Sequence, residues 1–270
     1  MNVIVNKFSI PTLLQAFDTN QIDVFSLLAC PPAGELTISP EIICLTTGIP
    51  HALVNGVLRT CLTAANTDTC IEETLNHFRF RQLPMMWTIS PATQPTDLDS
   101  HLEAHGLILL ATLPCMAVDL QVPVPTPSLA STVTIREVTD ASMLADWSQA
   151  AIAGFNILPE VIHLFAALSP VLGYGEQSPL RNFVAYLDGE PVGSSTVYLH
   201  AGVAGIYCVS VIPKARRYGI GAALTRIPLK VAQRLGYRFG MLLSSEMGVP
   251  IYRRLGFEEY GQFVRYGWQP

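Results

Sequence analysis

The sequence predicts a mixed α/β fold divided between two domains, and three observations support this prediction. Apolar strand-like runs alternate with helical patterns along most of the 270-residue chain. A strand, a basic turn with two glycines and a helix follow one another over residues 209–224. Proline alternates with other residues over 122–128, which disfavours both helix and central strand. We therefore expect domains at 1–121 and 132–270, joined by a Pro-rich linker at 122–131.

The second half of the chain shows a regular order of elements. Asp140 precedes an apolar helical pattern and is expected to cap it, while Pro228 lies inside a later helical pattern and is expected to kink it. In order we expect a strand at 133–138, helices to Phe155 and over 158–168, a hairpin at 182–199, a strand at 206–211, a helix at 219–235, a strand at 239–243, a short helix, and a strand at 258–268.

Composition narrows the functional classes. Half of the residues are apolar, which is enough for a large core, yet no stretch approaches the roughly 18 apolar residues of a membrane span. The N-terminus does not resemble a secretory signal, and the six cysteines lack disulfide-type or metal-type spacing. We therefore expect a cytoplasmic protein with no membrane association and no metal site.

Positive charge is concentrated in one part of the chain. Residues 1–120 carry four Lys/Arg against eleven Asp/Glu, whereas residues 121–270 carry twelve against ten. Seven cations follow one another without an intervening acid between Glu190 and Glu246: Lys214, Arg216, Arg217, Arg226, Lys230, Arg234 and Arg238. Interleaved aromatics are missing and the domain is not strongly basic, so we expect a small polyanion rather than a nucleic acid.

The basic turn has the features of a phosphate site. Gly219 and Gly221 allow the backbone to approach a ligand closely, and the helix that starts there directs free N–H groups and its positive dipole end toward the turn. A Walker A loop is excluded because two alanines follow Gly221, and a Rossmann fingerprint is excluded because Leu224 occupies the position of its third small residue.

The pattern Arg216-x-x-Gly219-x-Gly221 resembles the acetyl-CoA signature Arg/Gln-x-x-Gly-x-Gly/Ala of the GNAT-type N-acetyltransferases. The preceding strand ends in Val-Ile-Pro, and the later Tyr252-x-x-x-Gly256-Phe257 resembles another element of this family. The resemblance covers roughly residues 132–268. It implies a mixed, mostly antiparallel central sheet flanked by helices, with the fourth and fifth strands splayed apart around pantetheine.

The same resemblance implies the residues of the site. Tyr252 matches the tyrosine that donates a proton to the departing CoA thiolate, whereas the fourth strand offers no ready general base and Glu246 is the nearest carboxylate. The expected acetyl-CoA contacts are Val209, Ser210, Val211, Arg216, Arg217, Tyr218, Gly219, Ile220, Gly221 and Ala222.

The first half contains a pattern like that of the second. A helix at 71–81, a strand at 85–90, a helix at 97–105 and a strand to about Leu120 follow in the same order. It is either a degenerate GNAT-like copy, with Leu102 in the position of Tyr252 and no phosphate turn, or an unrelated α/β half. Residues 1–40 are expected to mix helix and loop.

Two functional hypotheses follow. The leading one is an acetyl-CoA-dependent N-acetyltransferase that acts on a primary amine of a small or amino-acid-like acceptor and releases CoA. The alternative is a non-catalytic acyl-CoA-binding or sensing protein. The oligomeric state, monomer or homodimer, is left open by the sequence.

Overall fold

The computed structural model describes residues 4–7, 9–29, 34–123, 129 and 131–270, so most of the expected linker lies outside the described residues. The chain divides into two compact units. The first unit combines Met1–Asn20 with Cys115–Tyr260, and the second combines Gln21–Pro114 with Gly261–Pro270. Each unit is therefore assembled from segments that are distant in sequence.

The sheet of the first unit is mostly antiparallel, as predicted. Residues 115–119 pair antiparallel with β10 (Phe239–Leu243), β10 pairs parallel with β9 (Val203–Val211), and the remaining neighbours are antiparallel. The strands, in spatial order, are β5 (Ile108–Asp119), β10 (Phe239–Leu243), β9 (Val203–Val211), β8 (Glu190–His200), β7 (Leu180–Leu187) and β6 (Val133–Glu137).

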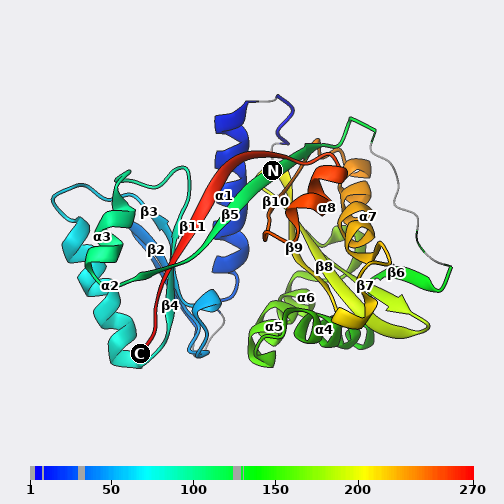
Figure 1. The fold of residues 1–270 in the computed structure, drawn as a ribbon, viewed down its shortest axis with the longest axis horizontal. Coiled ribbons are helices and arrows are strands. Elements are labelled where there is room, and N and C mark those ends of the chain that lie inside the picture. The colour runs from blue at the N-terminus through cyan, green and yellow to red at the C-terminus, as the bar shows by residue number, and fades with distance from the viewer. Residues whose placement is uncertain (1–3, 8, 30–33, 124–128, 130) are drawn as a thin grey trace. The chain divides into compact units, whose positions relative to one another are not determined.

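Helices cover both faces of this sheet (Figure 1). On one face the core forms beneath α4 (Ala141–Phe155) and α5 (Pro159–Ala166), around the fully buried Trp147. On the other face α7 (Ile220–Arg234) contributes Ile220 and Leu224 to the larger core. The short α8 (Val249–Arg254) completes this unit beside α7.

Local sequence signals account for most of these elements. Asp140 accepts a hydrogen bond from Met143 N at 2.9 Å and caps α4 as predicted. The hairpin turn uses Asp188 and Gly189, both with positive φ. The helix expected over 158–168 is divided: α5 ends at Ala166, and α6 (Leu168–Leu172) follows it with Pro170 in its first turn, where a missing N–H costs little. The helix α7 runs through Pro228.

The second unit has a smaller sheet. Its strands are β1 (Glu35–Ile38), β2 (Ile42–Thr46), β3 (Gly56–Thr60), β4 (Met85–Ile89) and β11 (Glu258–Trp268), of which residues 264–268 pair antiparallel with β4. The helices α2 (Thr67–Arg81) and α3 (Leu98–Ala104) pack on one face around Trp87 and Phe78. The helix α1 (Ile10–Ser26) has residues in both units and, like β1, falls where the sequence predicted only mixed helix and loop.

The two halves of the chain exchange strands, so the bounds of the compact units differ from the linear boundaries expected at 121 and 132. The strand beside β10 comes from residues 115–119 of the first half of the chain, and the strand beside β4 comes from residues 264–268 at the C-terminal end. Proline composition marks where a chain cannot form regular structure, but it carries no information about which strands pair. The described residues of the expected linker, 122–123, 129 and 131, fall within the Cys115–Tyr260 segment of the first unit.

A repeated turn supports the predicted degenerate copy. Gly106 and Gly256 each follow a short helix, and both have φ of 84°. In each case the next residue donates a backbone hydrogen bond of 3.0 Å across the helix end, from Leu107 to Leu102 and from Phe257 to Tyr252. Leu102 is fully buried in the second unit's core, so this position serves packing there.

One finding bears on membranes. Among the described residues, no helix combines the length and apolar character that a bilayer crossing requires.

Candidate active site

The basic turn lies between β9 and α7 in the first unit. A 3₁₀ turn, η3 (Pro213–Ala215), follows the strand, and the chain then enters α7 through two residues with positive φ, Arg217 at 69° and Gly219 at 76°. Glycine at 219 is favoured by this left-handed conformation. The local sequence thus bends the backbone so that the N-terminus of α7 follows directly after the basic turn.

Gly221 has a different reason to be glycine. A Cβ atom at this position would meet only Val211 Cγ2, at 3.7 Å, which is an ordinary contact. Packing within the protein therefore does not require glycine here. The open space suits a backbone that a ligand approaches closely.

The N-terminus of α7 offers a set of backbone donors. Its first turn-closing hydrogen bond runs from Ala223 N to Gly219 O at 3.1 Å, so the N–H groups of Ile220, Gly221 and Ala222 precede the intrahelical ladder. Gly219 at the N-cap position has no side chain that could bond them. The helix dipole adds partial positive charge at the same end.

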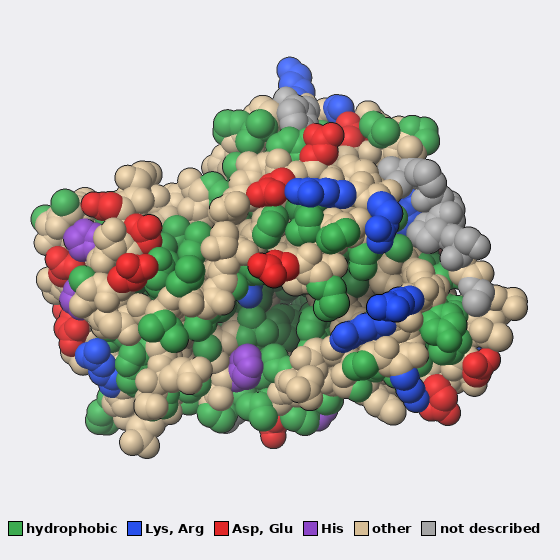
Figure 2. Space-filling view, viewed as in Figure 1, with side chains coloured by type: hydrophobic (Ala, Val, Ile, Leu, Met, Phe, Trp, Pro, Cys, Tyr) green, Lys and Arg blue, Asp and Glu red, His purple; other side chains and the backbone are tan. Residues whose placement is uncertain are grey.

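Full charges surround these donors. Arg216 is exposed, and its Nε donates to Val211 O at 3.2 Å, which ties the side chain to the end of β9. Lys214, Arg217 and Tyr218 are also exposed. Figure 2 shows Lys and Arg side chains on the half of the view in which α7 lies in Figure 1. These donors and charges suit a polyanionic ligand.

The strands β9 and β10 separate after a short parallel pairing. Only Ala204 with Gly240 and Gly205 with Met241 are paired, although β9 continues to Val211. The splay expected for the fourth and fifth strands is therefore present within the described part of this unit. It leaves the β10-facing backbone edge of residues 207–211 without a paired strand and able to bond a ligand.

A β-bulge in β9 reorients its side chains. The register with β8 shifts between Ser194 and Thr196, and Cys208 has φ of 52°, which is uncommon for a residue with a Cβ atom. Val209 and Val211 pack against the α7 core. Ser210 points toward α4 and bonds the Ser194 hydroxyl at 2.8 Å. Ser210, one of the expected contact residues, can therefore bond a ligand through its backbone only, because its side chain already bonds Ser194 in the core.

Tyr252 lies on α8, close to the beginning of α7. Its ring contacts Phe257 edge-on and packs closely over Gly248, where a Cβ atom would come within 2.7 Å of the ring. Burial raises the pKa of Tyr252 to about 12, and a side-chain hydrogen bond with Thr225 counters part of this rise. The phenol is therefore a proton donor at neutral pH.

Thr225 was not predicted as a site residue. It is fully buried, and its hydroxyl donates to Gly221 O at 3.0 Å, so it connects the turn-forming end of α7 to the hydroxyl of Tyr252. The only signal in the sequence was a hydroxyl on the apolar face of a helix, one turn after Gly221. Such a hydroxyl commonly bonds the carbonyl four residues earlier in the same helix. The sequence therefore gives no reason to expect a further contact with Tyr252.

The residues of β9 do not supply a general base. The Tyr207 hydroxyl donates to Asn20 Oδ1 at 2.6 Å, and burial raises the pKa of Cys208 to about 12. Glu246, the nearest carboxylate in sequence, is exposed in the loop before α8.

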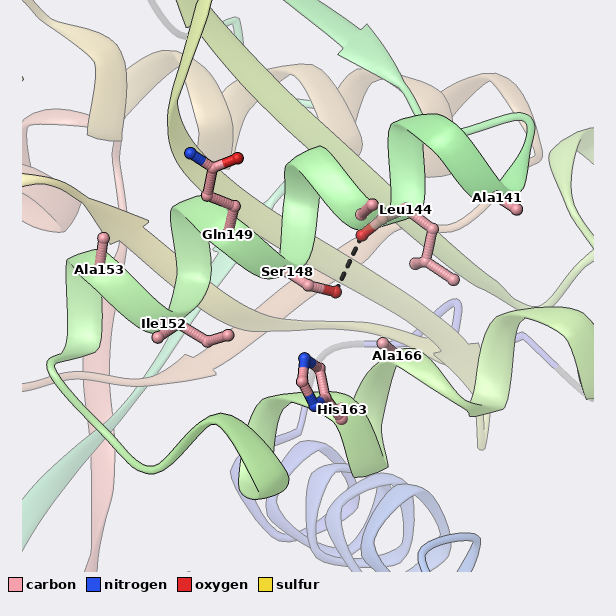
Figure 3. Close-up of a pocket in the computed structure, with 9 residues that line it drawn as sticks. Ala141, Leu144, Ser148, Gln149, Ile152, Ala153, His163 and Ala166 are labelled. Atoms are coloured by element: carbon pink, nitrogen blue, oxygen red, sulfur yellow. Dashed lines mark hydrogen bonds between the residues drawn. The ribbon is translucent and has the colours of Figure 1, made fainter.

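A groove lies between α4 and α5 in the same unit (Figure 3). Its volume is about 600 Å³, and its walls are mostly apolar, with Leu144 and Ile152 contributed by α4. Figure 3 shows the His163 imidazole pointing from α5 toward Ser148, whose hydroxyl donates to Leu144 O at 2.9 Å.

Comparison with known proteins agrees with this geometry. Residues 179–259 match the family model described as an acetyltransferase (GNAT) domain. The chain carries a GNAT acetyltransferase domain. The matched segment of the GNAT domain contains the basic turn, α7 and Tyr252.

Curated relatives share part of the chain. The mycothiol acetyltransferase of Cellulomonas flavigena is 30% identical over 186 residues, which cover 62% of this chain and 53% of the relative. That of Streptomyces avermitilis is 30% identical over 146 residues, covering 52% and 47%. That of Pseudarthrobacter chlorophenolicus is 38% identical over 71 residues, covering 25% and 22%. The chain thus spans about half or less of the length of these relatives.

Solved structures resemble the chain over nearly its whole length. A GCN5-related N-acetyltransferase from Kribbella flavida has a TM-score of 0.71 at 19% identity, covering 94% of this chain and 95% of that one. A tandem GNAT protein from the clavulanic acid biosynthesis pathway has a TM-score of 0.62 at 16% identity, covering 99% and 97%. At this level of identity the likeness shows the fold, including the second GNAT-like half that the sequence predicted.

Proposed function

We propose that the chain is an N-acetyltransferase that moves the acetyl group of acetyl-CoA to a primary amine of a small-molecule acceptor. The observation that carries the proposal is the placement of Thr225, whose hydroxyl donates to Gly221 O in the N-terminal turn of α7 and lies close enough to the Tyr252 phenol to lower its pKa. Through it, the proposed diphosphate site and the proposed acid belong to one buried network.

The residues of the chain suit the steps of this reaction. The free N–H groups at the start of α7 and the exposed Arg216 would hold the diphosphate of the donor. Acetyl-CoA supplies the activated thioester. The unpaired backbone edge of residues 207–211 would bond the pantetheine chain and position its end near Tyr252.

Tyr252 would complete the transfer as a general acid. The C–N bond forms as the C–S bond breaks, the phenol gives its proton to the departing thiolate, and the amine loses a proton to water. The buried phenol is suited to this role because its raised pKa keeps it protonated in the ground state. CoA and the N-acetylated acceptor are the products.

The curated relatives guide the choice of acceptor. Because they are named mycothiol acetyltransferases, deacetylated mycothiol belongs in the first panel of amines, beside simple amino acids and aminosugars. The competing function is acyl-CoA binding without transfer. It is favoured by the engaged side chains of Tyr207 and Ser210, which leave β9 without a base.

The two functions predict different results in one experiment. Purified protein is incubated with acetyl-CoA and each amine, and CoA release is followed with a thiol reagent after correction for the acceptor's own thiol. Mass spectrometry of the acceptor provides an independent measure of acetylation. Amine-dependent CoA release together with an acetylated acceptor supports the enzyme. Acetyl-CoA binding by calorimetry without turnover on any amine supports the binding protein instead.

A further inference from the structure

The second unit contains an arginine in an unusual place. Arg265 lies on β11, directly opposite Thr88 of β4. Its neighbours Val264 and Tyr266, and Trp268 beyond them, pack against the core beneath α2 and α3. Because side chains alternate along a strand, Arg265 lies on the opposite face of the sheet, which it shares with Thr88.

Arg265 is half-buried as a residue, and one of its guanidinium nitrogens lacks a hydrogen-bond partner within the described part of the chain. Its Nε is buried and makes no hydrogen bond there. Burial lowers the pKa of Arg265 to about 10, and no nearby carboxylate counters this effect. A buried cation without a counter-charge is unfavourable because it loses its hydration without gaining an equivalent interaction.

Two other arginines that are buried or half-buried do have hydrogen-bond partners. Arg181 is bidentate to Glu137, at 2.7 and 2.6 Å. Arg59, on β3 of the same unit as Arg265, donates from one terminal nitrogen to the carbonyls of Ser39 and Pro40. The Nε of Arg59 also makes no hydrogen bond among the described residues, so Arg265 differs from Arg59 and Arg181 in that no carboxylate or backbone carbonyl there accepts from its guanidinium.

We propose that the second unit binds a small anion at Arg265, with the Thr88 hydroxyl as an additional donor. The ligand class is a carboxylate or a phosphate group, since both match the planar, forked donors of a guanidinium. Arg265 supplies the positive charge, and Thr88 stands directly across the strand pair, where opposite side chains are within reach of a shared ligand. The site does not depend on acetyl transfer and is distinct from the basic turn of the first unit.

The test compares anion-dependent thermal stabilisation in the full-length protein. Acetate and inorganic phosphate are titrated separately at constant ionic strength, with chloride as the balancing anion. Three variants are compared. Arg265→Met replaces the guanidinium by an unbranched apolar side chain, Arg265→Lys keeps the positive charge, and Thr88→Val keeps the shape of the side chain. Arg79→Gln is the matched control, because it removes one positive charge from an exposed ion pair on α2 of the same unit.

We expect a saturable rise of Tm in the wild type that Arg265→Met abolishes and Arg79→Gln retains. Arg265→Lys and Thr88→Val should weaken the apparent affinity, by about tenfold for the lysine, because a bidentate contact is lost. In the absence of an anion, Arg265→Met should melt no lower than the wild type, since an unpaired buried charge has been removed. A response confined to acetate or to phosphate identifies the ligand class.

Phosphate can also bind the basic turn of the first unit, so only the part of the response that Arg265→Met removes is assigned to this site. Equal responses in the wild type and Arg265→Met would overturn the proposal. If Arg265→Met does not fold, unchanged responses in both Arg265→Lys and Thr88→Val overturn it as well. Acetyl-CoA affinity should be the same in Arg265→Met and the wild type, so failure here is distinguishable from failure of the proposed acetyl transfer.

Discussion

The ring of Tyr252 meets the ring of Phe257 edge-on, with 5.7 Å between the ring centroids and 60° between the planes. Tyr252 N donates a hydrogen bond to Gly248 O at 3.0 Å, and Tyr252 O accepts one from Phe257 N at 3.0 Å. The orientation of the phenol is thus set by both its ring and its backbone. This rigidity suits a group that must deliver a proton to one atom.

Replacing Tyr252 by Phe should reduce acetyl transfer while leaving acetyl-CoA binding unchanged. The ring and its contact with Phe257 are kept, and only the proton donor is lost, so we expect kcat to fall by about 10²-fold. Steady-state CoA release gives kcat, and calorimetry gives the acetyl-CoA affinity. A variant with full kcat would show that Tyr252 serves packing alone.

The titration of Tyr252 should be displaced to high pH. Burial raises its pKa in the folded protein to about 12, against about 10 in an unfolded chain. The neutral phenol is therefore favoured by folding, and this contribution to stability is complete below about pH 10 and lost as the pH rises toward 12. The absorbance difference at 295 nm between wild type and Tyr252→Phe isolates this phenol.

The measurement extends to pH 11, with circular dichroism recorded on the same samples to verify the fold. We expect little tyrosinate in the difference signal over that range. A full amplitude with a midpoint near pH 10 in folded protein would contradict the assigned burial.

Reversing the charge at Arg216 should weaken acetyl-CoA binding. Arg216→Glu places a carboxylate beside the α7 N-terminus, where it would repel the diphosphate and compete for the free N–H groups, so we expect at least about tenfold weaker binding. Arg234→Glu, at the other end of the same helix, is the charge-matched control and should bind as the wild type does. Equal calorimetric affinities for the Arg216 variant and the wild type would refute the diphosphate site.

Asn20 should be important for the stability of the first unit. It is fully buried, its Nδ2 donates to the carbonyls of Tyr198 and His200, and its Oδ1 accepts from Tyr207. Asn20→Ala removes these three buried hydrogen bonds, and we expect a loss of roughly 2–4 kcal/mol of unfolding free energy.

Denaturant unfolding measures this loss. The control is Asn76→Ala, an exposed side chain on α2 that bonds Arg79 and should change the unfolding free energy by less than about 0.5 kcal/mol. Similar values for the two variants would show that the Asn20 bonds contribute little.

The strand exchange predicts that a linear fragment is unstable. Residues 132–270 lack the strand at 115–119 that pairs with β10, so the backbone edge of β10 and the apolar cluster that includes Met116 and Val118 would be exposed. We expect the fragment to bind a hydrophobic dye and to show poorly dispersed amide NMR signals. A fragment beginning at residue 115 is the comparison, and equally well-dispersed spectra for both would argue against a structural need for the exchanged strand.

The sequence by itself determined the features that depend on neighbouring residues. Asp140 capping α4, the Asp188-Gly189 turn, the strand at 239–243 and the glycine-bearing entry to α7 all follow from local backbone and side-chain chemistry. The basic turn and the motif that begins at Tyr252 pointed to the GNAT domain because each of these motifs is a short, continuous stretch of sequence.

Only the tertiary structure decided which segments meet. The pairing of residues 115–119 with β10 and of residues 264–268 with β4 joins positions more than a hundred residues apart, and strand patterns do not encode a partner. The bond between Thr225 and Tyr252 and the isolation of Arg265 depend in the same way on the packing of distant elements. Local propensity acts within a few residues, whereas burial and the satisfaction of polar groups are properties of the assembled sheet and its helices.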